Sequence, residues 1–316
     1  MPPPGQASSK REIALSWREE DIIAAWEQTP RVRPSGYGVT GFAFPPQLEQ
    51  PIAYVKVGSQ AALQPELRNQ EYVWKALNDM PPDQTRGIRT PCVYRTFQSG
   101  HWFYIVMEYI PGKTLQQLMD QKDWSDPQRA ARTNSIARAM RLLMSIPVPA
   151  GQTPGPVGGG RIRHSLFRDD ISYCVYSSVD ELEKHLNDAS TIRFKTSPTV
   201  NLEKSLCFYY SDFYASNFIF TDSGDVAIID FDQAGFLPPS FMSYALAESH
   251  WVPGIWVSDV LKLPDHNLAA MRHIHYYFMI GGSSFGLPRR PKNDRTQLEG
   301  WTIQAYRQHC ESFQGN

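Results

Sequence analysis

The chain has 316 residues, of which 41% are hydrophobic and 20% charged, and its formal net charge is −1. This length is sufficient for a large buried core and favours two lobes or domains over one. Because charges of both signs balance, the composition excludes the global basic field with which proteins hold nucleic acids or anionic membranes.

The first third of the chain predicts a helix followed by a small β-rich region. The sequence Ser-Trp-Arg-Glu at 16–19 has capping-box spacing and opens an amphipathic stretch. Pro65 suits the first position of a later helix. The predicted elements are, in order, a helix over 17–28, a turn with Gly36, Gly38 and Gly41, a strand over 52–57 that carries Lys56, a helix over 65–77, a loop over 78–90, and strands over 92–97 and 102–109.

The rest of the chain is predicted to be mainly helical, with one strand-rich segment. A Gly- and Pro-rich stretch over 147–160 is too long for a simple connector and is typical of a functional or disordered loop. The predicted elements are a helix from Thr114, a helix over 126–145, that loop, a helix to residue 187 opened by a capping box at Ser178, strands within 205–232 and helices within 240–313.

The four cysteines and the N-terminal sequence bear on the cellular compartment. The cysteines are far apart and form no Cys-x-x-Cys pair, which predicts neither a zinc site nor a disulfide framework. The N-terminus lacks the pattern of a secretory signal, and no apolar run approaches the roughly 18 residues of a membrane span. We therefore expect a cytoplasmic protein with no membrane or nucleic-acid partner, and no feature specifies its oligomeric state.

A hairpin in the strand-rich segment carries polar residues with a chemical use. Two β-prone runs flank an Asp-Ser-Gly-Asp turn that begins at Asp222. If Ser223 and Gly224 form a two-residue turn, Asn217 and Asp230 face each other across the strands, with Cβ atoms about 4.5–5.5 Å apart. A carboxylate and an amide oxygen in that arrangement can share one Mg²⁺ ion.

A third acidic residue precedes this hairpin. Asp212 lies in the loop that enters the first strand, where it can face the same space. One carboxylate for a metal ion and one for a nucleophile are the minimum for phosphoryl transfer. The alternative interpretation is that Asp212, Asp230 and Asp232 merely line a polar loop.

The segment from Tyr209 to Asp232 resembles the catalytic and metal motifs of the aminoglycoside phosphotransferase and choline kinase group of kinase-fold enzymes, especially its many fungal members. The family pattern is His-Gly-Asp, four residues, Asn, a hairpin, and Ile-Asp followed by an aromatic residue. By this resemblance Asp212 matches the catalytic aspartate, Asn217 and Asp230 match the two metal ligands, and Asp232 assists them.

The N-terminal half resembles the same family at two places. Val-Met-Glu-Tyr-Ile-Pro-Gly-Lys-Thr-Leu at 106–115 is similar to the linker whose backbone binds adenine, which implies the Glu108 carbonyl and the Ile110 amide. Val-Lys-Val-Gly at 55–58 is similar to the strand whose lysine, here Lys56, binds the α and β phosphates.

Two further features of the N-terminal half are left with alternatives. The acidic partner of the strand lysine is expected on the following helix, where Glu66 matches best and Glu71 is the alternative. The three glycines at 36, 38 and 41 could shape a loop that covers phosphates, and a plain loop fits them equally well.

The resemblance implies an α+β, protein-kinase-like, two-lobed fold with a small β-rich N-lobe and a larger, mainly helical C-lobe. Residues 1–109 would form the nucleotide-binding lobe, and residues 110–316 would carry the catalytic loop, the metal site and the acceptor site. The implied activity is transfer of the γ-phosphate of ATP, with Mg²⁺, to a hydroxyl group of a small molecule.

The chain departs from the family pattern directly before the catalytic aspartate. Tyr210-Ser211 stand where the family has His-Gly, and an aromatic residue with a hydroxyl group can brace the loop in place of histidine. The departure motivates an alternative, a catalytically silent kinase-like regulator that binds a nucleotide or ligand. A third interpretation is the same fold performing another reaction.

Several conspicuous polar residues are expected to lie outside the catalytic set. His273 and His275 are two positions apart on a predicted helix and do not share a face, so with His266 they are interpreted as structural. The stretch over 155–164, with its arginines at 161 and 163 and its histidine at 164, resembles a family segment that reaches toward the active cleft. It could cover phosphates or substrate, and a solvated loop fits it equally well.

Overall fold

The protein is described by a computed structural model that covers residues 4–30, 40–121, 124–249, 252–289, 296 and 300–314. Two of the turn glycines, Gly36 and Gly38, lie outside these described residues. The chain divides into two compact units: an N-terminal unit of residues 1–123 with 216–230, and a C-terminal unit of residues 124–215 with 231–316.

These compact units cut the chain differently from the sequence division at residue 110. Residues 110–123 belong with the N-terminal unit, as does the hairpin segment over 216–230. The assignment of nucleotide binding to residues 1–109 stays a prediction.

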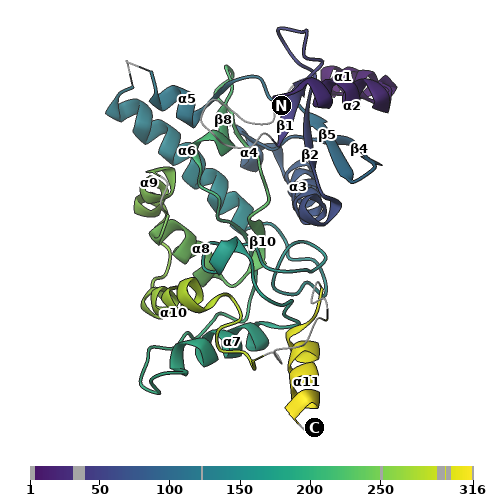
Figure 1. The fold of residues 1–316 in the computed structure, drawn as a ribbon. Helices are drawn as coiled ribbons and strands as arrows, with labels where there is room; N and C mark the ends of the chain where they lie inside the picture. The colour runs from purple at the N-terminus through teal and green to yellow at the C-terminus, as the bar shows by residue number, and fades with distance from the viewer. Residues whose placement is uncertain are drawn as a thin grey trace. The chain divides into compact units, whose positions relative to one another are not determined.

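The N-terminal unit contains two small four-stranded sheets (Figure 1). One is antiparallel throughout, in the order β1-β2-β5-β4, and the other has the order β3-β9-β8-β6, with β3 parallel to β9. The elements of the N-terminal unit are α1 (Pro4–Ser16), α2 (Glu19–Gln28), β1 (Gly41–Phe44), β2 (Ala53–Gly58), α3 (Gln60–Asp79), α4 (Pro82–Thr85), β3 (Ile88–Arg89), β4 (Val93–Ser99), β5 (Trp102–Glu108), β6 (Lys113–Thr114), α5 (Leu115–Met119), β8 (Phe218–Phe220) and β9 (Val226–Ile228).

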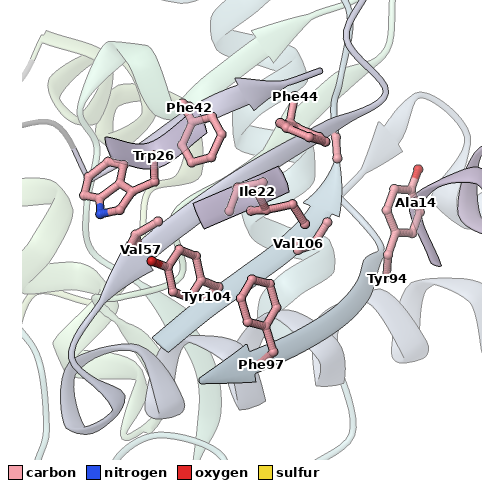
Figure 2. Packing of buried hydrophobic residues seen from close by; sticks show 12 residues of the cluster. Ala14, Ile22, Trp26, Phe42, Phe44, Val57, Tyr94, Phe97, Tyr104 and Val106 are labelled. Carbon is pink, nitrogen blue, oxygen red and sulfur yellow. The ribbon is translucent and has the colours of Figure 1, made fainter. Parts of the chain in front are cut away.

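The first sheet has an apolar cluster on each face because side chains alternate along its strands. On β5, Tyr104 and Val106 join a cluster with Ile22 and Trp26 of α2 (Figure 2). The intervening residues of β5 join a second cluster with Leu63 and its neighbours on α3. The strand that carries the predicted phosphate-binding lysine is therefore held between helices on both faces.

Two helix starts in this unit differ from the sequence prediction. The capping box predicted at 16–19 is wrong, because Ser16 ends α1 and Arg18 occupies the N-cap of α2. Pro65 does not begin α3, which starts five residues earlier, where the Ser59 hydroxyl accepts a hydrogen bond from the Ala62 amide at 3.3 Å. The serine cap fixes the start, and the proline is accommodated inside the helix.

The C-terminal unit is mainly helical, as predicted, with one two-stranded sheet of β7 and β10 (Figure 1). The serine half of the capping box predicted for α7 is confirmed, because the Ser178 hydroxyl accepts from the Glu181 amide at 3.2 Å. The Glu181 carboxylate accepts from the Ser177 amide at 2.7 Å and so does not complete the box. Apart from β8 and β9, the elements assigned after residue 124 are α6 (Asp126–Met144), η1 (Arg168–Asp170), α7 (Val179–Thr191), β7 (Cys207–Tyr210), η2 (Ala215–Asn217), β10 (Ala234–Leu237), α8 (Pro239–Ala247), α9 (Val252–Leu261), α10 (Leu268–Gly281) and α11 (Ile303–Gln314). Among the described residues, no helix is both long and apolar enough to cross a bilayer.

Two fully buried histidines connect the helices and loops of the C-terminal unit. The Nε2 atom of His164 is 3.0 Å from the Phe241 carbonyl, and its Nδ1 accepts from a backbone amide. The ring of His185 lies between the Tyr176 hydroxyl at 2.7 Å and the Phe285 carbonyl at 2.9 Å. Burial lowers the pKa of each histidine to about 4, so both are neutral at neutral pH.

Acidification from pH 6.5 toward pH 4 should therefore destabilise the protein. In the unfolded chain each histidine takes up a proton with a pKa of 6.5, whereas in the folded protein the pKa is about 4. The two neutral histidines contribute fully to the free energy of unfolding above pH 6.5, and this contribution is lost as the pH falls toward 4. The free energy of unfolding should fall by up to about 1.4 kcal/mol per pH unit for each histidine. Urea unfolding measured at intervals across this window checks the slope.

A variant separates the histidines from the other titrating groups. His185→Gln keeps a hydrogen-bonding side chain but removes the proton uptake, so its stability should fall less steeply with decreasing pH than that of the wild type. Equal slopes for the two proteins would contradict the assignment.

Candidate active site

A buried lysine with two carboxylate partners forms the centre of the site in the N-terminal unit. The Nζ atom of Lys56, on β2, lies 2.6 Å from Oε1 of Glu66 on α3 and 2.9 Å from Oδ1 of Asp230. The Glu66 side chain is only 2% exposed, that of Lys56 12%, and that of Asp230 35%. The strand, the helix and the segment after β9 thus meet at one ammonium group.

The two carboxylates keep this lysine charged. Burial by itself lowers the pKa of Lys56, but the attraction and hydrogen bonds of Glu66 and Asp230 outweigh it and raise the pKa above the ordinary value of 10.5. Of the two acidic residues considered on α3, Glu66 is the one that contacts the lysine. Partial burial raises the pKa of the other, Glu71.

The linker that follows β5 is tied to the second sheet of the same unit. The Glu108 carboxylate binds the Arg89 guanidinium at 2.5 Å and receives the Cys92 amide at 3.4 Å. Because Arg89 lies on β3, which pairs with β9, this ion pair connects the end of β5 to the hairpin that carries the predicted metal ligands. Ile110, predicted to offer its amide to adenine, is 5% exposed in the same linker.

The hairpin of β8 and β9 exists, but its predicted register is wrong by one residue. Phe218 pairs with Ile228, so Asn217 lies opposite Ile229, whose amide donates to the Asn217 carbonyl at 3.0 Å. The turn is longer than the predicted two residues because it runs from Thr221 to Asp225, with a hydrogen bond from the Thr221 amide to the Asp225 carbonyl.

Asp230 therefore follows the residue that Asn217 faces. Its backbone has a φ of 62°, a left-handed conformation that aspartate tolerates better than most residues. The hydrogen bonding of the hairpin ends at Ile229, and the backbone turns at Asp230. In this conformation the Asp230 carboxylate accepts a hydrogen bond from Lys56.

The donor set of this hairpin fits a magnesium ion. Asn217, 6% exposed, supplies an amide oxygen, and Asp230 uses one carboxylate oxygen for Lys56 and retains the other. Mg²⁺ is usually bound by one or two such groups together with phosphate oxygens and water. A group of three or more His, Cys, Asp or Glu residues that could hold a metal ion is absent from the described part of the chain.

The predicted base, Asp212, lies in the C-terminal unit on a braced loop. Its carboxylate accepts the Tyr214 amide at 3.4 Å. The ring of Tyr210, which is fully buried, packs edge-on against Phe213 at 6.0 Å and Phe231 at 5.6 Å. This tyrosine therefore packs as a brace of the loop at the position where the family pattern has histidine.

Hydrogen bonds fix the Asp212 loop to the segment that follows the β8–β9 hairpin. The Ser211 amide donates to the Gln233 carbonyl at 3.0 Å, which continues the β7–β10 ladder by one residue. Asp212 and Asp232 each lie one residue beyond this pair in the chain, outside β7 and β10. The predicted site residues Asp212 and Asp232 thus belong to the C-terminal unit, whereas Lys56 and Asp230 meet in the N-terminal unit.

Asp232 has a partner that the sequence did not indicate. Its carboxylate forms an ion pair with Nη1 of Arg163, which follows the Gly- and Pro-rich loop over 147–160. That loop is ordered here: Gly155 exchanges two backbone hydrogen bonds with Phe236 of β10, and the Arg163 carbonyl accepts the Tyr209 hydroxyl at 2.8 Å. Arg89 was missed as a site residue because it carries no local motif, whereas Arg163 lies in the stretch over 155–164 that resembles a family segment reaching toward the active cleft.

A sequence model of the phosphotransferase enzyme family (APH) matches residues 53–258, which is more than half of the chain. The protein therefore belongs to this family. No curated protein sequence matches the chain significantly.

Solved structures support the fold. A thermostable mutant of the aminoglycoside phosphotransferase APH(4)-Ia in its apo form is similar over 93% of this chain and 97% of its own, with 14% identity and a TM-score of 0.51. A further mutant of that enzyme, in a ternary complex with AMP-PNP and hygromycin B, has 14% identity and a TM-score of 0.50 over 93% of this chain and 96% of its own. The predicted α+β, protein-kinase-like fold is confirmed.

Proposed function

We propose that the protein is a small-molecule kinase that uses ATP and Mg²⁺. The observation that carries the proposal is the Lys56 ammonium held by both Glu66 and Asp230, beside the hairpin of Asn217. A fixed, permanently charged lysine next to a carboxylate and an amide oxygen is the electrostatic arrangement that a nucleotide polyphosphate requires.

The nucleotide and the metal ion would bind residues of the N-terminal unit. Adenine would bind the linker through the Glu108 carbonyl and the Ile110 amide, and the α and β phosphates would bind Lys56. Asn217 and Asp230 would hold Mg²⁺, which when bound neutralises charge on the β and γ phosphates. By the family resemblance, Asp232 would assist these two metal ligands.

Asp212 would act on the acceptor. In the proposed reaction the acceptor hydroxyl oxygen forms a bond to the γ phosphorus while the bond from that phosphorus to the β–γ bridging oxygen breaks. ADP leaves with the electron pair, and the hydroxyl proton passes to the Asp212 carboxylate. The proposal requires this carboxylate to reach the hydroxyl while the phosphates lie on Lys56, so most of the catalytic effect is positioning and charge stabilisation.

Binding and turnover must be measured separately to test the proposal. Calorimetric titration with AMP-PNP and Mg²⁺ tests nucleotide binding, and phosphorus NMR tests γ-phosphate transfer from ATP to hydroxyl compounds: sugars, amino alcohols, secondary metabolites and aminoglycosides such as hygromycin B. Binding together with an acceptor phosphate ester supports a kinase.

Other outcomes of these measurements point to the alternatives. Nucleotide binding without ATP consumption across the panel favours the catalytically silent regulator. AMP attached to a product, or product without ATP, indicates another reaction on the same fold. No binding of AMP-PNP at all contradicts the proposed function.

A further inference from the structure

The ion pair between Arg163 and Asp232 is built into the same part of the C-terminal unit as the predicted base. Asp232 precedes Gln233, which pairs with Ser211, and Ser211 precedes Asp212. The arginine is therefore connected to the Asp212 loop through one carboxylate and one rung of the β7–β10 ladder.

The backbone on both sides of Arg163 is fixed. Its neighbours Ile162 and His164 are fully buried, and the His164 ring is hydrogen-bonded at both nitrogens. The Arg163 carbonyl itself accepts the Tyr209 hydroxyl. A side chain on such a rigid support loses little further entropy when it binds a ligand, unlike an arginine on a mobile loop.

The guanidinium retains donors for a ligand. Asp232 contacts only Nη1, and within the described part of the chain neither Nε nor Nη2 of Arg163 has a hydrogen-bond partner. Neither atom is among the fully buried unpartnered groups, and the side chain is 21% exposed. A guanidinium with a carboxylate on one edge and free N–H groups on another is suited to an anionic oxygen.

The charges of the motif indicate which anion this is. In the proposed reaction a phosphoryl group must reach Asp212, and the carboxylates of Asp212 and Asp232 in the C-terminal unit repel it. The positive charge of Lys56 offsets the negative charge of Asp230 in the N-terminal unit. In the C-terminal unit Arg163 offsets the negative charge of Asp232 in the same way. Negative charge on the phosphoryl oxygens must be stabilised during transfer.

We propose that Arg163 donates hydrogen bonds to the phosphoryl group as it is transferred, and that Asp232 positions Arg163 instead of binding the metal ion. The inference rests on the proposed function. Lys56 and the proposed metal ligands belong to the N-terminal unit. In this proposal Arg163 is a catalytic cation of the C-terminal unit, which also carries the proposed base Asp212.

Fluoroaluminate, a mimic of the transferring phosphoryl group, tests this without knowledge of the acceptor. Wild-type protein saturated with Mg²⁺ and ADP should bind fluoroaluminate and show bound fluorine NMR signals. Arg163→Met should weaken this binding by about 10²–10³-fold, the usual effect of removing one preorganised donor. Arg163→Lys should retain part of the affinity with shifted signals, and ADP affinity should be unchanged in both variants.

Two matched variants complete the experiment. Arg168→Met removes a half-exposed arginine of η1, five residues after Arg163, so its fluoroaluminate affinity should equal that of the wild type. Asp232→Asn should weaken fluoroaluminate binding by about 10-fold, as loss of an orienting partner does, while the Mg²⁺ requirement for ADP binding stays unchanged. A large rise in that requirement would instead identify Asp232 as a metal ligand and overturn its positioning role.

The failures of the two proposals are distinguishable. If wild-type protein does not bind Mg²⁺ and ADP, the proposed function is wrong. If it binds them but not fluoroaluminate, or if a folded Arg163→Met protein binds fluoroaluminate with the wild-type affinity and spectrum, the inference about Arg163 is wrong and the proposed function stands. Circular dichroism and thermal unfolding establish folding, and Arg163→Lys serves if the methionine variant is unfolded.

Discussion

Asp212→Asn should lower turnover by about 10²–10⁴-fold while nucleotide affinity stays nearly unchanged, because the substitution removes a general base and little else. Asparagine has the same shape and keeps an oxygen for the Tyr214 amide, so the loop should retain its conformation. The loop is also braced by the buried Tyr210 ring, which the substitution does not touch. Initial rates on the acceptor found by phosphorus NMR, with calorimetry of AMP-PNP binding, measure the two quantities.

A matched control uses an aspartate on the turn of the metal hairpin. Asp222 is exposed there, so Asp222→Asn makes the same chemical change away from the proposed reacting groups and should leave turnover intact. Wild-type turnover in Asp212→Asn would rule out the base assignment. A joint loss of turnover and nucleotide affinity would point to a structural role for the carboxylate.

The sequence predicted those parts of the fold that depend on neighbouring residues. The apolar run of β5 and the two apolar runs of the β8–β9 hairpin are local patterns, and both sets of strands form. The helix α1 was not predicted because it has no apolar stripe: Ala14 is buried, whereas Ile13 and Leu15 are exposed. Local periodicity identifies an element only when one face of it is buried.

The hairpin register shows where local reasoning was insufficient. The composition of the Asp-Ser-Gly-Asp turn favours two residues, but the Thr221 hydroxyl accepts the Asp225 amide at 3.1 Å and stabilises a longer loop. Because side chains alternate, a shift of one residue changes which groups face each other. Asp230 still reaches Lys56 because its backbone turns out of the strand.

The remaining contacts of the site join residues far apart in the chain. Glu66 was preferred over Glu71 by family alignment, and the ion pair with Lys56 is indeed made by Glu66. The ion pair of Arg163 with Asp232, 69 positions away, has no periodic signature, and arginines outside the core are usually solvated. The family resemblance pointed to the stretch over 155–164, but only the folded structure shows that Arg163 is the residue that pairs with Asp232.

Lys56→Met should lower the free energy of unfolding by about 3–5 kcal/mol, because it leaves the buried Glu66 carboxylate without its cation. Affinity for Mg²⁺ and AMP-PNP should also fall. Since the pKa of Lys56 is raised, its ion-pair contribution is complete below pH 10.5 and is lost only as the pH rises beyond that value, so the effect should be constant through the neutral range. Urea unfolding and calorimetry measure the two losses, with the exposed Lys75→Met as the control.

A double variant separates the two effects of this lysine. Replacing both partners, as in Lys56→Met with Glu66→Leu, removes the buried unpaired charge, and exchanges of this kind are often neutral for stability. The double variant should therefore recover most of the unfolding free energy but none of the nucleotide affinity, because the phosphates still lack their cation. If it remains as unstable as Lys56→Met, the unpaired Glu66 charge is not the cause of the loss. If it recovers nucleotide binding, Lys56 does not hold the phosphates.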